Sequence, residues 1–170
     1  MTRLFETPRL VLRHFEPDDA EELHTVFGDP KVMERIPGGP SPSLQETRRR
    51  LMKIIEHQQE HGFSLWAIVE KNSGKLIGDC GLILVEGRGP EIEISYDIAY
   101  EFWGRGYATE AASRCLRFGI EQLKLKRVIG LTYADHIASR RVMENSGMVY
   151  EKRVERYSRE LVQYTTNTPL

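Results

Sequence analysis

Polar side chains alternate with apolar ones along segment 91–98, which reads EIEISYDI. In an extended strand, successive side chains point to opposite faces of the sheet. The set on the polar face is Glu91, Glu93, Ser95 and Asp97. A carboxylate on such a face can act as a general base, taking a proton from a reacting group. We take Glu93 as the first candidate base and Asp97 as the second. The alternative is an ordinary strand with a solvated polar face.

A pair of glycines, Gly104 and Gly106, follows this strand and directly precedes a segment with helical periodicity. Small and apolar residues recur there at positions 108, 111, 112, 115, 116, 119 and 123. The first four N–H groups of a helix have no intrahelical partner, and with the helix dipole they form an anion site. Glycine lets a phosphate approach the backbone closely. The segment therefore predicts a phosphate-binding turn, or else a tight strand-to-helix connection.

Two common phosphate-binding templates do not fit this turn. A dinucleotide fingerprint, G-x-G-x-x-G/A, requires a small residue where Thr109 stands. A P-loop requires Gly-Lys-Ser/Thr, which the sequence lacks. If the turn binds a phosphate, it therefore does so by neither the dinucleotide-binding nor the P-loop pattern.

The elements that must position these residues alternate between strands and helices, without internal repeats. Strands are predicted at 9–15, 64–71, 75–85, 91–98, 127–134, 149–156 and 161–166, from alternation and β-branched content. Helices are predicted at 16–28, 44–62, after Gly106, and at 138–147, from apolar spacing and from Gly and Pro at the ends. A Gly- and Pro-rich loop is predicted at 36–43. The pattern predicts one α/β domain with a mixed sheet over residues 1–170, with no dividing linker.

The composition is that of an ordinary globular protein, with 40% hydrophobic and 29% charged residues. Basic and acidic residues number 24 and 25, so no nucleic acid or anionic membrane is indicated as a partner. No apolar run approaches the ~20 residues of a membrane span, and the N-terminus lacks a signal core, so we expect a cytoplasmic protein. Two cysteines, Cys80 and Cys115, and histidines without ligand spacing predict no metal site. Both thiols are expected to be buried.

Four stretches in the same order resemble the GNAT family of acetyl-CoA-dependent N-acetyltransferases, most closely the branch that acetylates N-termini of ribosomal proteins. They are ETPRLVLRHFEPDDAEEL, WAIVEKNSGKLIGDCGL, EIEISYDIAYEFWGRGYATEA and ASRRVMENSGMVYEKR. The resemblance covers nearly the whole chain. It implies a single-domain GNAT fold, with a central mixed, mostly antiparallel sheet flanked by helices. It also implies acetyl-CoA as co-substrate and no metal.

The resemblance also assigns cofactor-binding positions. The family's pyrophosphate loop, Gln/Arg-x-x-Gly-x-Gly/Ala, falls on 103–108, where Gly106 and Ala108 match and Trp103 departs from the pattern. By the same resemblance, Ile98 and Tyr100 flank the pantetheine arm. His136 stands where asparagine is usual in the family. The full implied set is Ile98, Tyr100, Trp103, Gly104, Arg105, Gly106, Tyr107, Ala108, Thr109, His136 and Ser139.

Acetyl transfer to an amine needs a neutral amine, a polarised thioester carbonyl and a proton for the leaving thiolate. The resemblance gives the last task to Ser139, which protonates or hydrogen-bonds the departing sulfur; the alternative is a helix-capping hydroxyl. An α-amine has a pKa of about 7.7–8.0, whereas a lysine amine has about 10.4 and costs roughly 4 kcal/mol more to deprotonate. A modest base such as Glu93, or a water relay, therefore suffices for an α-amine.

Three functions remain open at this point. The first is acetylation of a protein N-terminal α-amine, which the branch resemblance favours. The second is acetylation of a small amine such as a polyamine, an amino sugar or an antibiotic. The third is an acyl-CoA-binding sensor without turnover, although both Glu93 and Ser139 are present. Homodimers are common in the family, and no residue decides whether this chain forms one.

Overall fold

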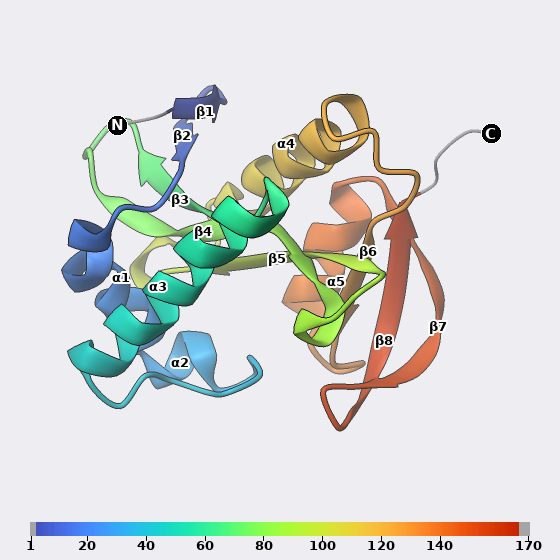
Figure 1. Ribbon diagram of the computed structural model, residues 1–170. Helices are drawn as coiled ribbons and strands as arrows, with labels where there is room; N and C mark the ends of the chain where they lie inside the picture. The colour runs from blue at the N-terminus through green and yellow to red at the C-terminus, as the bar shows by residue number, and fades with distance from the viewer. Residues whose placement is uncertain (1–2, 167–170) are drawn as a thin grey trace.

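The computed structural model describes residues 3–166, which form an eight-stranded sheet in the order β1-β2-β3-β4-β5-β6-β8-β7 (Figure 1). The strands are β1 (Arg3–Glu6), β2 (Leu10–Arg13), β3 (Leu65–Glu70), β4 (Leu76–Leu84), β5 (Ile92–Ile98), β6 (Ile129–Thr132), β7 (Met148–Arg156) and β8 (Arg159–Thr166). Neighbouring strands are antiparallel except β5 and β6, which are parallel. The predicted mixed, mostly antiparallel sheet is confirmed.

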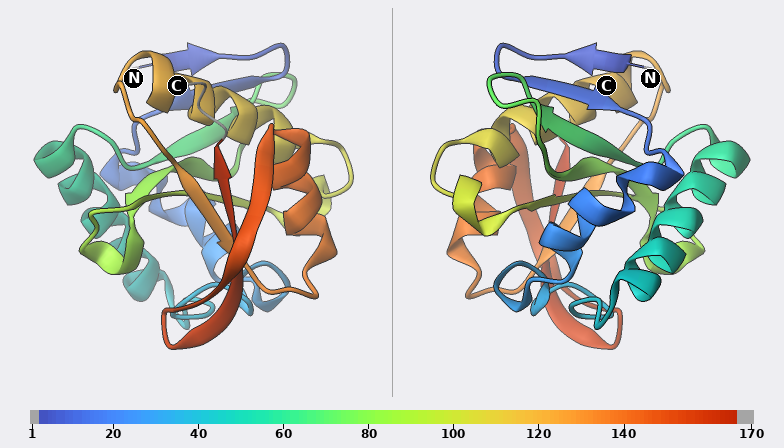
Figure 2. Two further views of the ribbon diagram at one scale, coloured as in Figure 1. Left: turned by 90° about the vertical axis from the view of Figure 1, so that its right-hand side faces the viewer. Right: turned by 90° about the vertical axis from the view of Figure 1, so that its left-hand side faces the viewer.

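Helices cover both faces of this sheet (Figure 2). They are α1 (Ala20–Phe27), α2 (Pro30–Met33), α3 (Leu44–His61), α4 (Tyr107–Glu121) and α5 (Ile137–Asn145), with short 3-10 turns η1 (Pro17–Asp19), η2 (Val85–Gly87) and η3 (Tyr100–Phe102). One face of β4 and β5 packs against α4, where Gly119 lies close to the Leu82 side chain. The other face lies under α1 and α3. No helix of the described residues is long and apolar enough to cross a membrane.

The predicted helix at 44–62 is present as α3, and its end at Gly62 is the one predicted from the sequence. The Ser43 side chain accepts a hydrogen bond from the Glu46 N–H at 3.1 Å, and Gly62 ends the helix with a left-handed φ of 77°. The predicted helix at 16–28 is shorter than expected. Its first turn is the 3-10 turn η1, because the Asp19 carboxylate accepts from the Glu16 N–H and pairs with Arg13.

Two elements were missed from the sequence, β1 and α2. Both have four residues, too few for a periodic pattern to stand out. The α2 helix begins at Pro30, after the Asp29 side chain accepts from the Lys31 N–H. It brings Met33 to the wall of the central cavity, so a short element outside the predicted set contributes to the site.

The decisive feature of the sheet is a split between β5 and β6. These parallel strands pair at one position only, Glu93 with Ile129, and then separate. The first five strands and the β8–β7 hairpin thus form two arms that diverge beyond this pairing (Figure 1). The Ala99 N–H donates to the Ile77 carbonyl on β4. In an antiparallel pair, alternate residues direct their backbone groups to opposite sides of the strand, so the N–H and C=O groups of Tyr96 and Ile98 face the split.

Candidate active site

A cavity of about 920 Å³ occupies the split and is lined from both faces of the sheet. On one side its walls come from the glycine loop, the first turn of α4 and α5. On the other side they come from α2, α3, η2 and the β7–β8 hairpin. Strand β5 lies between the two sets, so its polar and apolar faces look into different halves of one cavity.

Glu93 lies at the base of the split and is 8% exposed, which excludes the solvated-face interpretation of this strand. Burial disfavours the charged form and raises the pKa of Glu93 to about 7, although a hydrogen bond from the Tyr157 hydroxyl opposes the rise. The Tyr157 Oη donates to Glu93 Oε2 at 2.9 Å. Glu93 is thus a buried carboxylate able to exchange a proton near neutral pH.

Tyr157 is held in an unusual backbone conformation at the tip of the β7–β8 hairpin. It and Ser158 have φ of 53° and 54°, in the left-handed region that non-glycine residues rarely adopt. Its N–H donates to the Glu86 carboxylate at 2.7 Å, and its hydroxyl accepts from the Glu86 N–H at 3.0 Å. These bonds between η2 and the hairpin offset the strain and aim the phenol at Glu93.

A pair of buried acids lies farther along the same face as Glu93. Asp97 on β5 is 7% exposed and lines the cavity, and burial raises its pKa to about 7. It stands opposite Asp79 of β4, which is fully buried, and among residues 3–166 neither Asp79 carboxylate oxygen has a hydrogen-bond partner. Burial and the neighbouring Asp97 charge raise the pKa of Asp79 well above its usual value.

Ser139 lies on α5, across β5 from Glu93, and its hydroxyl is 3.0 Å from the Tyr96 hydroxyl. Tyr96 is also 3.0 Å from the Ser139 carbonyl oxygen, to which it can donate. Burial raises the pKa of the Tyr96 phenol, so this group stays protonated. Glu93 and Ser139 therefore flank the split from opposite faces of the sheet.

The glycine loop opens the cavity at the N-terminus of α4. Gly106 has a φ of 79° and forms the N-cap without any side-chain hydrogen bond to the first turn. The first intrahelical bond runs from the Glu110 N–H to the Gly106 carbonyl, so the amides of 107–109 have no partner within the helix. Within the described part of the chain, a Cβ added at Gly104 would meet no atom within 4 Å, and one added at Gly106 would meet only the Arg9 guanidinium.

Arg9, which was not selected from the sequence, braces this loop. Its guanidinium donates to the Arg105 carbonyl at 2.8 Å and to Glu110 of α4 at 2.7 Å. It also stacks over the Tyr107 ring at 4.4 Å. Strand β2 is therefore tied to the loop and to the helix that follows it.

The expected cofactor positions divide into two groups. Those that line the cavity are Ile98, Trp103, Gly104, Gly106, Tyr107, Ala108, Thr109, His136 and Ser139. Tyr100 and Arg105 lie outside the lining: Tyr100 stacks edge-on against Trp103, and the Arg105 side chain donates to the Glu101 carbonyl. The Trp103 indole donates to the Ile98 carbonyl at 2.7 Å, which fastens the loop to the end of β5.

His136 lies beside the Thr132 hydroxyl, with Nδ1 3.3 Å from Oγ1, and burial lowers its pKa. The cysteines follow their prediction, since Cys80 and Cys115 are fully buried between the sheet and α4. Among residues 3–166, no group of three histidines, cysteines or acids could hold a metal ion.

The comparison with known proteins agrees with this architecture. The profile of the acetyltransferase (GNAT) domain matches residues 9–149. The chain therefore belongs to the GNAT family of acetyltransferases, enzymes that use acetyl-CoA to acetylate an amine. The uncharacterized protein YkkB of Bacillus subtilis (strain 168) is 31% identical over 93% of this chain and 92% of its own length.

Solved structures show the same fold. A GNAT-family acetyltransferase from Bacillus anthracis is 26% identical, with a TM-score of 0.79 over 97% of this chain and 96% of its own. The structure of RimL, the ribosomal L7/L12 α-N-protein acetyltransferase, in complex with coenzyme A superposes with a TM-score of 0.77 over 96% of both chains, at 16% identity.

Sequence reasoning missed four residues that the fold brings to this site or its supports: Arg9, Asp79, Tyr96 and Tyr157. Tyr96 carried a misleading signal, because it shares a face with the apolar residues Ile94 and Ile98 of its strand. Asp79 stands as a lone acid within the apolar run LIGDCGLIL, which is a readable signal of a buried charge. Tyr157 gave none, because only the tertiary structure sets it against Glu93.

Proposed function

We propose that this acetyltransferase moves the acetyl group of acetyl-CoA to a protein N-terminal α-amine. The proposal is carried by Glu93, a buried carboxylate with a pKa of about 7 in the cavity that the glycine loop opens. An α-ammonium group, with a pKa of about 7.7–8.0, can lose its extra proton to such a base near neutral pH and so become the neutral amine. A lysine amine, with its higher pKa, would require a stronger base.

The glycine loop fits the pyrophosphate of the co-substrate. The amides of 107–109, which have no partner among the described residues, and the positive end of the α4 dipole would bind this negative charge. Open space at Gly104 lets the phosphates approach the backbone. The backbone groups of Tyr96 and Ile98 that face the split would pair with the pantetheine arm, except that the Ile98 carbonyl already accepts from Trp103.

In the proposed reaction the amine attacks the thioester carbonyl directly and its proton passes to Glu93. The tetrahedral intermediate then collapses, and the departing sulfur takes a proton from the Ser139 hydroxyl. The Tyr96 hydroxyl, within 3.0 Å, orients the Ser139 hydroxyl, and Ser139 regains a proton from solvent while Glu93 releases to solvent the proton that it took. Asp97 remains the second candidate base. A covalent acyl-cysteine route is not supported, because neither Cys80 nor Cys115 lines the cavity.

The likeness to RimL and the sequence resemblance to the ribosomal-protein branch support an α-amine acceptor. The lining also argues against a polycationic small amine. Lys53 and Arg159 both border the cavity, and a polyamine would meet like charges there.

The test is release of free CoA thiol from acetyl-CoA across a panel of acceptors. The panel holds peptides with varied N-termini, the same peptides with blocked α-amines, polyamines, amino sugars and aminoglycosides. We expect turnover on peptides that disappears when the α-amine is blocked. Turnover confined to one small-amine class would move the assignment to that class. Binding of acetyl-CoA without turnover on any acceptor would instead indicate a sensor.

A further inference from the structure

We infer that the acceptor carries a carboxylate close to its reacting amine, and that Lys53 and Arg159 bind this carboxylate. The inference rests on the proposed transfer to an N-terminal α-amine. It narrows the substrates to N-termini with an acidic side chain among their first residues.

The charges on the acceptor half of the cavity do not balance. By the acceptor half we mean its walls from α2, the α2–α3 loop, α3, η2 and the β7–β8 hairpin. The charged side chains of the whole lining are Arg35, Glu46, Arg50, Lys53, Glu93, Asp97 and Arg159. The two acids on β5, Glu93 and Asp97, have pKa values raised by burial to about 7 and are only partly ionised at neutral pH.

Two of the cations already have partners. Arg50 pairs with Glu46 on the same helix, and its guanidinium also donates to the Gly38 and Gly39 carbonyls. Arg35 pairs with Asp135 at 2.7 Å. These two cations are therefore compensated within the protein, and Lys53 and Arg159 remain.

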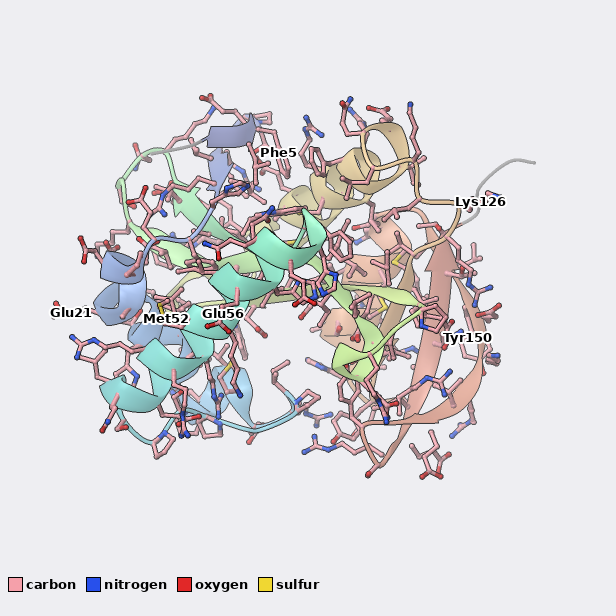
Figure 3. The ribbon with its side chains drawn as sticks, viewed as in Figure 1. Phe5, Glu21, Met52, Glu56, Lys126 and Tyr150 are labelled. Atoms are coloured by element: carbon pink, nitrogen blue, oxygen red, sulfur yellow. The ribbon has the colours of Figure 1, made fainter. Side chains whose placement is uncertain are left out.

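Lys53 is presented to the cavity by the geometry of α3. The lining residues of this helix recur at helical spacing: Glu46, Arg50, Lys53, Ile54 and His57. Met52 and Glu56 lie on a different face of the helix (Figure 3). Among the described residues, no carboxylate lies within ion-pair distance of Lys53.

Arg159 lies on the opposite wall, at the start of β8 and two residues after Tyr157. Its guanidinium donates to the Tyr133 hydroxyl and lies over the same ring, 5.8 Å from its centre. No carboxylate of the described residues pairs with it. Because Tyr157 holds Glu93, Arg159 is a cation beside the expected position of the reacting amine.

Two cations near this position, the partly buried Arg159 and the exposed Lys53, favour one kind of acceptor. They disfavour an amine that carries further positive charge and lower the pKa of the amine itself. A carboxylate on the acceptor would compensate both, through charge-assisted hydrogen bonds. Such bonds correspond to a preference of roughly tenfold to a hundredfold in kcat/KM.

The test uses acceptors in matched pairs that differ by one charge. Peptides with glutamate, glutamine or lysine at the second position are compared at fixed acetyl-CoA. The amino acids glutamate and glutamine, and their α-amides, form a small-molecule arm. We expect the glutamate peptide to exceed the glutamine peptide about tenfold or more in kcat/KM, and the lysine peptide to be the poorest.

The variants Lys53→Gln and Arg159→Gln connect the preference to the two side chains. Each should lower the glutamate-to-glutamine ratio, and the double variant should bring it near one, while the affinity for acetyl-CoA stays unchanged. Lys75→Gln, at an exposed position outside the cavity, is the control and should keep the wild-type ratio.

Equal turnover of the charged and neutral peptides would overturn the inference and leave the proposed function intact. Turnover confined to small amines would overturn the proposed function, and the anionic preference would then be decided within the amino-acid pairs. A preference that survives in the double variant would refute the assignment to Lys53 and Arg159. Absence of turnover on every pair would overturn both proposals.

Discussion

At the scale of single residues, the site depends on contacts between side chains far apart in the sequence. Glu93 and Tyr157 share a hydrogen bond of 2.9 Å, and Ser139 and Tyr96 share one of 3.0 Å. The first pair lies on the acceptor side of β5 and the second on the side of α4 and α5. The proposed base, Glu93, and the proposed acid, Ser139, therefore lie on opposite faces of β5.

The first prediction concerns Tyr157→Phe. The Tyr157 hydroxyl stabilises the Glu93 carboxylate, so its loss should raise the pKa of Glu93 above about 7. The active base form then requires a higher pH, and the acid limb of kcat/KM should move upward. Since one hydrogen bond is worth about 1 kcal/mol, activity below neutral pH should fall roughly fivefold and recover at alkaline pH.

Tyr150→Phe is the matched control for this change. Tyr150 lies on the outer side of β7, is 52% exposed and is not part of the cavity lining (Figure 3). Its pH profile should coincide with that of the wild type. An unmoved acid limb in Tyr157→Phe would show that Glu93 is not the titrating base.

The second prediction concerns Ser139→Ala. Removal of the hydroxyl should lower kcat by about 10²-fold or more, the range of a lost general acid, while the Kd of acetyl-CoA changes little. Tyr96→Phe should have a smaller effect in the same direction, because Tyr96 acts through Ser139. Wild-type turnover in Ser139→Ala would limit this serine to a structural role.

At the scale of elements, the glycine loop is a backbone device supported by its neighbours. Gly104 and Gly106 have φ of 73° and 79°, which β-branched residues adopt only with strain. Arg9, which directly precedes β2, and the Trp103 indole fasten the two sides of the loop. The N-terminus of α4 is thereby held open toward the cavity.

The third prediction concerns Gly106→Val. A β-branched side chain at this φ should distort the turn and obstruct the approach of phosphate to the backbone. We expect the Kd of acetyl-CoA to rise about tenfold or more, measured by calorimetry. Gly74→Val is the control, because Gly74 has a similar φ of 70° and open surroundings in the β3–β4 turn. Equal affinity in both variants would remove the phosphate role of the loop.

At the scale of the whole molecule, the centre of the sheet contains buried acidic side chains next to the split. Asp79 and Asp97 face one another across β4 and β5. Asp79 has no hydrogen-bond partner among the described residues, so its ionised form is costly. Ionised Asp79 therefore lowers the free energy of unfolding, while the buried acids make the sheet polar next to the cavity.

The fourth prediction concerns Asp79→Asn and the pH dependence of stability. The Asp79 pKa is raised in the folded state by burial and by the Asp97 charge, so the folded protein holds a proton that the unfolded chain has released. Stability is then full below about pH 4, near the unfolded pKa, and falls as pH rises through the folded pKa.

Asp79→Asn should remove much of this fall. We expect the variant to be more stable than the wild type at pH 8, by about 1–3 kcal/mol in urea unfolding, and the two to converge as the pH falls to about 4. Asp18→Asn, at an exposed position, should leave the wild-type dependence unchanged. A constant difference between Asp79→Asn and the wild type across this pH range would contradict the assignment.

The strands and helices that position the site could be predicted from local patterns. Alternation in 91–98 identified β5, and apolar spacing after Gly106 identified α4, because a period of two or 3.6 is written into neighbouring residues. The dependence on local patterns also explains which elements were predicted wrongly. β1 and α2 span four residues each, and the 3-10 start of the predicted helix at 16–28 depends on a carboxylate of its own first turn.

The sequence by itself determined the fold class, the glycine loop and the polar face of β5, since each depends on residues adjacent along the chain. Only the tertiary structure decided which charges are buried, because burial depends on segments that meet across the sheet. Tyr157 reaches Glu93 from 64 positions away, and Lys53 and Arg159 line one cavity from a helix and a hairpin. Loop closure over such distances leaves no local pattern, so the proton affinity of Glu93 and the charge of the acceptor half emerge only when the chain is folded.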